Sequence, residues 1–335
     1  MQNLKVWDNP SKDVVGDTPV DFLRMLGGAA VIYIDGRDSS RTRVLVTLTH
    51  GNEPSGLRAV HRWLAAGDRQ PAVNIVVILG AVATALTQPL FFYRHLPGRR
   101  DLNRCFRAPY DEDDEGRLAL AMLDEIRKHR PEAVVDMHNT SGSSNPFAIV
   151  SGDSEKKRRL AGWFVDCLIN SDLRLGALME RDAELDVPIV TVEAGGVQDS
   201  KTADNAWLGV SNYFSQVDLY QSAPQVYVLH NPLRLELCHD ASIDYSDRCL
   251  PDTQVVVRKD IEAFNFVPVR CEDMLGWLNG GGLGNLKVIK GEQTCDAEVF
   301  FRLEEGKFYP RNKMQVFMAT TQRNIAVSDC LFYFI

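Results

Sequence analysis

Short runs made up mainly of apolar residues constrain the fold of this chain more than any other sequence feature. They are bounded by Gly, Pro or charged residues and lie at 44–49, 74–79, 133–137, 146–151 and 188–192. Such runs are typical of strands buried inside a sheet. Between them, apolar residues recur at helical spacing, as at Leu57, Val60 and Leu64. The alternation predicts an α/β fold with a mostly parallel mixed sheet flanked by helices.

The sequence pattern changes near residue 222. Before it, we expect a helix of about 15 residues from Glu155 and another from Thr202. After it, no long helical pattern follows, and Gly- and Pro-rich turns separate strand-like runs at 225–228, 254–257, 286–289 and 297–301. We therefore predict two domains, an α/β domain at 1–222 and a small β-rich domain at 223–335.

Charge and hydropathy argue against several classes of function. The 37 basic and 45 acidic residues give a formal net charge of −8, which disfavours nucleic-acid binding. No apolar segment approaches the roughly 20 residues that cross a bilayer, so we expect no membrane partner. The N-terminus lacks the apolar core of a signal peptide, and the seven cysteines include no Cys-x-x-Cys pair. We therefore expect a cytoplasmic protein with reduced thiols, of unknown oligomeric state.

Three of the apolar runs end in residues that can bind a metal or transfer a proton. His50 and Glu53 follow the first of these runs, His138 ends the second, and Glu193 ends the third. In an open parallel sheet, the carboxyl ends of the strands meet at the edge where ligands bind. We therefore expect these four side chains to gather at one edge of the sheet.

His50, Glu53 and His138 form a His₂Glu set that suits zinc and leaves its fourth coordination position open for water. We expect one zinc ion per chain. Gly51 and Gly56 flank the first two ligands, and we expect them to let the chain turn sharply enough to aim both at one ion. Taken singly, these residues have simpler explanations, a polar loop for the first pair and a hydrogen-bonded core histidine for His138.

Glu193 lies outside this ligand set. A carboxylate beside a zinc-bound water can take its proton and later pass it to a leaving nitrogen. We therefore interpret Glu193 as the general base and acid. Asp136 lies two residues before His138, on the same face of the strand, and either orients that ligand or makes a structural hydrogen bond.

The segment from Arg94 to Arg104, which we call the arginine-rich loop, is strongly basic within an acidic protein. A guanidinium pairs with a carboxylate at two points, and near a zinc ion it can also polarise a carbonyl. Arg94, Arg100, Asn103 and Arg104 are therefore candidate substrate-binding residues. The alternative is a solvated loop whose arginines pair with neighbouring acids.

Four motifs follow one another as Thr49-His-Gly-Asn-Glu-Pro-Ser-Gly56, Arg100-Asp-Leu-Asn-Arg104, Asp136-Met-His-Asn-Thr140 and Val192-Glu-Ala-Gly195. Together they resemble the succinylglutamate desuccinylase/aspartoacylase family, a branch of the zinc carboxypeptidase-like hydrolases. The motifs occur in the order and with separations similar to those of that family, and the resemblance covers roughly residues 44–200.

The resemblance implies a zinc carboxypeptidase-like fold in which His50, Glu53 and His138 bind zinc. It also implies that Glu193 is the general base and acid. The β-rich domain looks similar to the family's second domain, which covers the active site. Within it, Tyr309 lies in a segment like the one that offers a tyrosine to the site.

The resemblance also implies how the substrate is held. Asn103 and Arg104 match the residues that bind the substrate carboxylate. The family places a further arginine shortly before this motif to polarise the carbonyl, and Arg94, Arg99 and Arg100 compete for that role. The spacing of this segment departs from the aspartoacylase and desuccinylase pattern, so the acyl group is left open.

The leading hypothesis is a zinc-dependent hydrolase acting on a small anionic substrate. It would cleave the amide of a small carboxylate-bearing N-acyl amino acid or related compound, as a deacylase. The nearest alternative is a metallocarboxypeptidase acting on short peptides with the same metal ligands. A third possibility, a non-catalytic binding protein on the same fold, fits less well because the ligands and Glu193 are all present.

Overall fold

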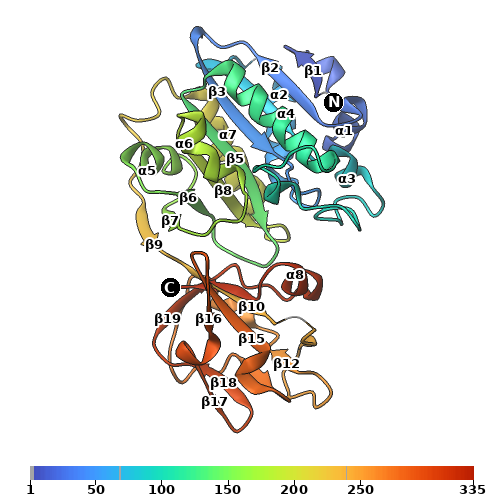
Figure 1. Ribbon diagram of the computed structural model, residues 1–335. Helices are drawn as coiled ribbons and strands as arrows, with labels where there is room; N and C mark the ends of the chain where they lie inside the picture. The colour runs from blue at the N-terminus through green and yellow to red at the C-terminus, as the bar shows by residue number, and fades with distance from the viewer. Residues whose placement is uncertain (1–3, 68, 239) are drawn as a thin grey trace. The chain divides into compact units, whose positions relative to one another are not determined.

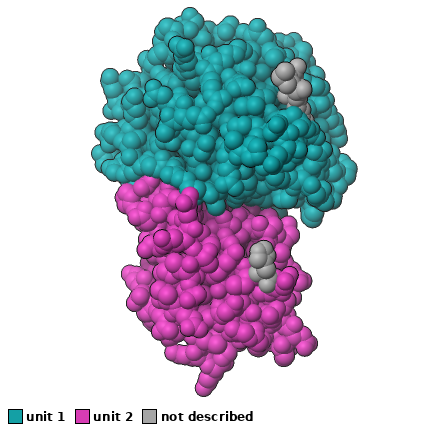
Figure 2. Space-filling view, viewed as in Figure 1, with its two compact units in different colours: residues 1–139, 146–168, 174–228 teal, residues 140–145, 169–173, 229–335 magenta. Residues whose placement is uncertain are grey.

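The computed structural model of the protein describes residues 4–67, 69–238 and 240–335. The chain divides into two compact units, which Figure 2 colours separately. The first unit comprises residues 1–139, 146–168 and 174–228, and the second comprises 140–145, 169–173 and 229–335. Each unit has an apolar core of its own.

A long mixed sheet forms the frame of the first unit (Figure 1). Its strands, in spatial order, are β1 (Lys5–Asp8), β2 (Ala30–Ile34), β4 (Val73–Leu79), β3 (Asp38–Thr47), β5 (Ala133–Thr140), β8 (Ile189–Gly196), β6 (Phe147–Ser151), β7 (Cys167–Ser171) and β9 (Tyr227–His230). The last residues of β7 and β9 are grouped with the second unit.

The central strand, β3, pairs in parallel with both of its neighbours. Val46 is opposite Ile78 of β4 and Asp136 of β5. The pairs β2–β4 and β6–β8 are antiparallel. The sheet is therefore mixed with a parallel centre, which confirms the predicted fold class, and β3 and β5 emerge at the same edge.

Helices cover both faces of this sheet. They are α1 (Pro19–Leu26), α2 (Ser55–Ala66), α3 (Val82–Leu86), α4 (Asp114–His129), α5 (Glu155–Ala161), α6 (Asp182–Leu185) and α7 (Thr202–Ser215), and 3₁₀-helices lie at Lys12–Val14, Leu102–Arg104 and Leu178–Arg181. Phe22 of α1 and Phe214 of α7 pack with Leu45 on one face, whereas Met122 of α4 packs with Val44 on the other. Because both faces are covered, the central strands carry apolar residues on both sides, as in Val44–Val46 of β3. Among the described residues, no helix is long and apolar enough to cross a membrane.

The long helix predicted from Glu155 is wrong in extent. α5 ends at Ala161, and β7 follows a few residues later. The helix stops at Gly162, where a Cβ would lie 2.1 Å from the carbonyl oxygen of Pro224. The end of the predicted segment, from Cys167, belongs to the buried strand β7, which periodicity alone cannot distinguish from a buried helix.

The second unit consists mainly of two sheets of short strands. One contains, in spatial order, β13 (Pro268–Val269), β19 (Met314–Phe317), β20 (Phe332–Phe334), β10 (Leu233–Leu237), β15 (Leu286–Lys290) and β16 (Gln293–Asp296). The other contains β11 (Ile243–Tyr245), β12 (Val255–Val257), β14 (Gly276–Leu278), β18 (Lys307–Pro310) and β17 (Phe301–Glu304). The short helix α8 (Arg323–Ser328) and 3₁₀-helices at Ile261–Phe264, Gly282–Asn285 and Ala297–Val299 complete it. Its core is built from aliphatic side chains and a cluster of phenylalanines that includes Phe301, Phe308 and Phe334. The two sheets confirm the β-rich character predicted for this part of the chain.

Candidate metal centre

His50 and Glu53 lie on the turn between β3 and α2. Leu48, directly after β3, has a φ of 56°, a left-handed conformation that is uncommon for residues other than glycine. Gly51 and Gly56 do not have left-handed φ values. They are needed because a Cβ at either position would clash with neighbouring atoms. A Cβ on Gly56 would lie 2.1 Å from a side-chain oxygen of β3. The structure thus assigns the sharp turn to Leu48 and close packing to the two glycines, which corrects our expectation.

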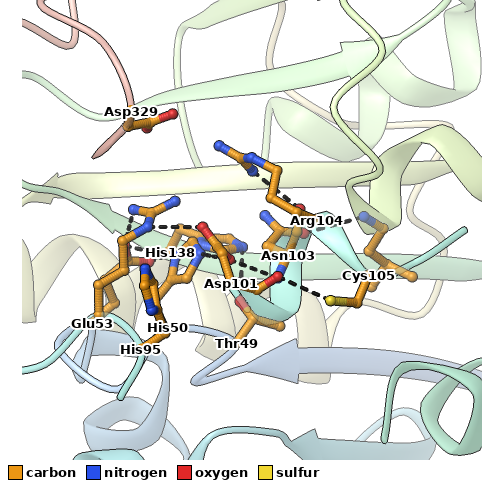
Figure 3. Close-up of polar contacts among 12 residues, drawn as sticks. Thr49, His50, Glu53, His95, Asp101, Asn103, Arg104, Cys105, His138 and Asp329 are labelled. Atoms are coloured by element: carbon orange, nitrogen blue, oxygen red, sulfur yellow. Dashed lines mark hydrogen bonds and ion pairs between the residues drawn. The ribbon is translucent and has the colours of Figure 1, made fainter. Parts of the chain in front are cut away.

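The side chains of His50, Glu53 and His138 converge on one point (Figure 3). Oε1 of Glu53 lies 2.9 Å from Nδ1 of His50, and Oε2 lies 2.7 Å from Nδ1 of His138. All three side chains are buried, and one ligand atom from each lies within 4.8 Å of the others. The group could hold a metal ion. Two imidazole nitrogens and one carboxylate are a ligand set typical of catalytic zinc.

Each of the two histidines contacts a second carboxylate through its other ring nitrogen. Nε2 of His50 lies 2.9 Å from Oδ1 of Asp101, and Nε2 of His138 lies 2.9 Å from Oδ2 of Asp136. Oγ1 of Thr49 lies 3.1 Å from the same nitrogen of His138. This arrangement is typical of metal-binding histidines, since donation from one nitrogen leaves the other available to the metal.

Electrostatics favour a positive charge at the centre of this group. Burial raises the pKa of Glu53, but His50 and His138 lower it further, so that the carboxylate stays ionised. Burial lowers the pKa of His138, but Asp136 and Glu53 raise it well above its ordinary value. The carboxylates around the two rings therefore suit a bound cation.

Glu193 lies in β8, the strand next to β5, and pairs with Phe147 of β6. Its side chain is buried, and its Oε2 has no hydrogen-bond partner among the described residues. Burial raises the pKa of Glu193 to about 7, while His138 opposes this rise and Glu53 adds to it. A carboxyl group that titrates near neutrality can both accept and donate a proton at physiological pH.

Of the three arginines that compete to polarise the carbonyl, the structure brings Arg94 to the metal centre. Its Nε donates to Oδ2 of Asp101 at 3.0 Å, and its Nη1 lies 3.5 Å from Oε1 of Glu53. Its side chain is only 14% exposed. Arg94 therefore places a positive charge next to a metal ligand.

Arg100 and Arg99 contact the start of α4 instead. Nη2 of Arg100 lies 2.7 Å from Oδ1 of Asp113, and Nη1 of Arg99 lies 2.7 Å from Oδ2 of Asp114. Neither guanidinium has a described contact with the metal ligands. The assignment of Arg100 to substrate binding therefore stays a prediction without structural support.

Asn103 and Arg104 lie in the 3₁₀-helix Leu102–Arg104, beside Asp101 in Figure 3. Asp101 caps this helix by accepting a hydrogen bond from the Asn103 N–H at 2.8 Å. Oδ1 of the buried Asn103 accepts from the N–H of Leu178 at 3.2 Å, and Nη1 of Arg104 donates to the Asn103 carbonyl at 3.0 Å. The segment is thus anchored to the metal centre through Asp101, while its binding of a carboxylate stays a prediction.

Tyr309 lies in β18 of the second unit. The guanidinium of Arg302 lies over its ring, 4.8 Å from the centroid. Its contribution to the active site stays a prediction.

Sequence reasoning missed three residues that contact the metal ligands, Asp101, Thr49 and Asn139. The Asn139 N–H donates to Oε2 of Glu53 at 3.3 Å, and its side-chain oxygen accepts from the N–H of Ser55 at 3.2 Å. Each of the three lies inside one of the four motifs. Their position within these motifs, next to or near a predicted functional residue, is the signal that could have found them.

Solved structures of other proteins share this fold at low sequence identity. The succinylglutamate desuccinylase from Vibrio parahaemolyticus is 13% identical with a TM-score of 0.60, over 91% of this chain and 85% of that one. The enzyme of that name from Chromobacterium violaceum is 14% identical with a TM-score of 0.57, over 91% and 87%. The product-bound ectoine utilization protein from Ruegeria pomeroyi is 16% identical with a TM-score of 0.55, over 91% and 87%.

Sequence comparison identifies the family. Curated protein sequences give no match to this chain. Residues 39–214, just over half of the chain, match the succinylglutamate desuccinylase/aspartoacylase catalytic domain. This segment includes the three candidate metal ligands, Glu193 and the whole arginine-rich loop. The chain therefore belongs to the succinylglutamate desuccinylase/aspartoacylase family of hydrolases.

Proposed function

We propose that this chain is a zinc-dependent deacylase. It cleaves the amide bond of a small, carboxylate-bearing N-acyl amino acid or related compound and releases an acid and an amine. The convergence of His50, Glu53 and His138 beside the buried Glu193, whose pKa their charges affect, carries this proposal.

The buried acids and histidines have separate roles. His50, Glu53 and His138 hold the zinc ion, which supplies Lewis acidity when bound. Glu193 takes a proton from the attacking water on its carboxylate and later delivers it to the leaving nitrogen. Burial raises the pKa of Glu193 to about 7 in the protein without metal, which supports a group that can both accept and donate this proton.

The arginine-rich loop supplies the contacts to substrate. Arg94, beside Glu53, stabilises the negative charge that develops on the carbonyl oxygen during attack. Asn103 and Arg104 bind the substrate carboxylate, for which a guanidinium offers two-point pairing. The solved relatives named for succinylglutamate, itself an N-acyl amino acid, support this substrate class.

Amine release from a substrate panel tests the proposal. Zinc-loaded protein is given N-acetyl, N-succinyl and N-formyl amino acids beside dipeptides, with chelator-treated and zinc-restored samples as controls. We expect higher kcat/KM for one of the N-acyl classes. Faster cleavage of dipeptides would instead identify a metallocarboxypeptidase. No hydrolysis at stoichiometric zinc would indicate a binding protein.

A further inference from the structure

Asp101 stands at the junction of the metal centre and the arginine-rich loop (Figure 3). Its Oδ1 lies 2.9 Å from Nε2 of His50 and accepts the Asn103 N–H at 2.8 Å. Its Oδ2 accepts from Nε of Arg94 at 3.0 Å. One carboxylate therefore contacts a metal ligand, the carbonyl-polarising arginine and the turn that carries the substrate-binding pair.

These contacts are sheltered from water. The side chains of Asp101 and Arg94 are each 14% exposed, and that of His50 is 3% exposed. Charge-assisted hydrogen bonds in such surroundings are shorter and stronger than those between neutral groups, and they fix the direction of both partners. Asp101 thus ties the position of Arg94 to that of His50, alongside Glu53, whose Oε1 also lies near both side chains.

Asp136 provides an internal comparison. Its Oδ2 lies 2.9 Å from Nε2 of His138, but its Oδ1 has no hydrogen-bond partner among the described residues. Both aspartates therefore contact a metal-binding histidine in the same way. Of these two aspartates, only Asp101 also contacts an arginine of the arginine-rich loop.

We propose that Asp101 is a positioning residue that fixes the metal ligand His50 and the substrate arginine Arg94 together, so that metal binding and carbonyl polarisation are coupled. The arm of this proposal that concerns Arg94 rests on the proposed function. The arm that concerns His50 depends only on metal binding.

Two substitutions separate these arms. In Asp101→Asn, the amide oxygen still accepts from Nε2 of His50 and from the Asn103 N–H, but its NH₂ group then faces the Nε–H of Arg94. Two donors cannot pair, so Arg94 loses its hydrogen bond to residue 101 while His50 stays oriented. Asp101→Ala removes all three contacts, to His50, to the Asn103 N–H and to Arg94. Asp136→Asn is the matched control, because it keeps the histidine contact and has no arginine to release.

Zinc affinity, measured by competition with a chelator, tests the His50 arm. Loss of such an outer partner weakens metal binding by about 10–100-fold, which we expect for Asp101→Ala. Asp101→Asn and Asp136→Asn should both bind zinc within about tenfold of the unmodified protein, since each keeps its hydrogen bond. Unchanged zinc affinity in Asp101→Ala would overturn this arm, whether or not the protein hydrolyses any substrate.

A double-mutant cycle in kcat/KM, at saturating zinc, tests the Arg94 arm. If Asp101 acts through Arg94, Asp101→Asn should add little to the loss caused by Arg94→Ala. By contrast, any loss caused by Asp136→Asn should be independent of Arg94, so in the double variant it should multiply the loss caused by Arg94→Ala. Multiplicative effects for Asp101→Asn would overturn the arm and leave Asp101 as a cap of its turn.

An NMR measurement keeps the Arg94 arm testable if no panel substrate is hydrolysed. The Nε–H signal of Arg94, assigned by its loss in Arg94→Ala, should be protected from exchange in the unmodified protein and in Asp136→Asn. It should lose that protection in Asp101→Asn. Retained protection would overturn the arm, whereas an inactive protein with the expected NMR result would refute only the proposed function.

Discussion

The first unit buries charged side chains at both ends of the β3–β5 pair, but the hydrogen bonding of these side chains differs between the two ends. Arg43, opposite the first residue of β5, is completely buried. Its Nε donates to Glu132 at 2.6 Å, and its Nη1 donates to the carbonyl oxygens of Tyr213 and Gln216 at 2.7 Å each. With a further bond from Nη2 to the carbonyl oxygen of Val217 at 3.3 Å, this guanidinium closes the carboxyl end of α7 and uses most of its donors.

At the other end, near the carboxyl end of β5, buried acids are only partly satisfied. Oδ1 of Asp136 and Oε2 of Glu193 have no hydrogen-bond partner among the described residues. Buried polar groups are ordinarily paired, so each exception needs an explanation. For Glu193, the proposed role in proton transfer supplies one. The comparison teaches that the buried charge of Arg43 stabilises the fold through its several hydrogen bonds, whereas the unpaired oxygen of Glu193 is left available for chemistry.

Substitution of Glu193 should have the largest effect, and it tests the proposed catalytic role of the carboxyl end of the β3–β5 pair. General acid–base catalysis contributes about 10²–10⁴-fold, so Glu193→Gln should lower kcat/KM by that factor. Zinc binding should persist because Glu193 is outside the ligand set. Steady-state kinetics with zinc content measured on the same sample would check this. Full turnover of a zinc-loaded Glu193→Gln protein would show that another group moves the proton.

Arg43→Met tests the stabilising role of the opposite end of the β3–β5 pair, where Arg43 is buried. Removal of one partner from a buried ion pair costs about 3–5 kcal/mol, because Glu132 and the carbonyl oxygens lose their donor. Urea unfolding would measure this loss in the free energy of unfolding. Arg41→Met is the control, since Arg41 contacts the same Glu132 at 3.4 Å but its side chain is 34% exposed. It should cost at most about 1 kcal/mol. Equal losses for both variants would contradict the comparison.

Arg94→Ala should give a somewhat smaller effect that is confined to catalysis. Loss of one donor to a developing oxyanion lowers kcat by about 10²–10³-fold. Arg99→Ala removes the same charge from the same loop, but Arg99 pairs with the exposed Asp114. It should change kcat/KM by less than about threefold, as expected for a surface ion pair. If Arg99→Ala or Arg100→Ala proved the more damaging, Arg94 would not be the polarising residue.

The pH dependence of activity should show the smallest effect. Glu193 must be ionised to act as a base, so kcat/KM should rise with pH through its pKa and fall about tenfold per pH unit below it. Burial raises that pKa to about 7 in the protein without metal, and a bound cation lowers it. The acidic limb of the zinc-loaded enzyme should therefore lie below pH 7. A limb centred well above pH 7 would contradict this assignment.

Much of the site could be predicted because its parts lie at the ends of buried strands. His50, His138 and Glu193 follow apolar runs, and parallel pairing of β3 with β5 aligns the first two automatically. The fold class followed from the same runs. Both predictions rest on local patterns whose spatial consequence is fixed by strand geometry.

The rest depends on tertiary contacts that local sequence patterns do not specify. The choice of Arg94 over Arg100 is decided by Asp101 and Asp113, and nothing in the spacing of the loop says which acid each arginine meets. The end of α5 depends on Gly162 packing against Pro224. Local propensity carries no information about either contact.

The close packing at Gly51 has a consequence for protein engineering. Its N–H donates to the carbonyl oxygen of Arg94 at 3.0 Å, and a Cβ on Gly51 would lie 2.8 Å from the carbonyl oxygen of Tyr93. The metal-binding turn and the arginine-rich loop therefore move as one block. An arginine-rich loop transplanted from a relative should fit only if residues 48–56 are transplanted with it. Engineering a new specificity in this scaffold therefore requires replacing both segments together.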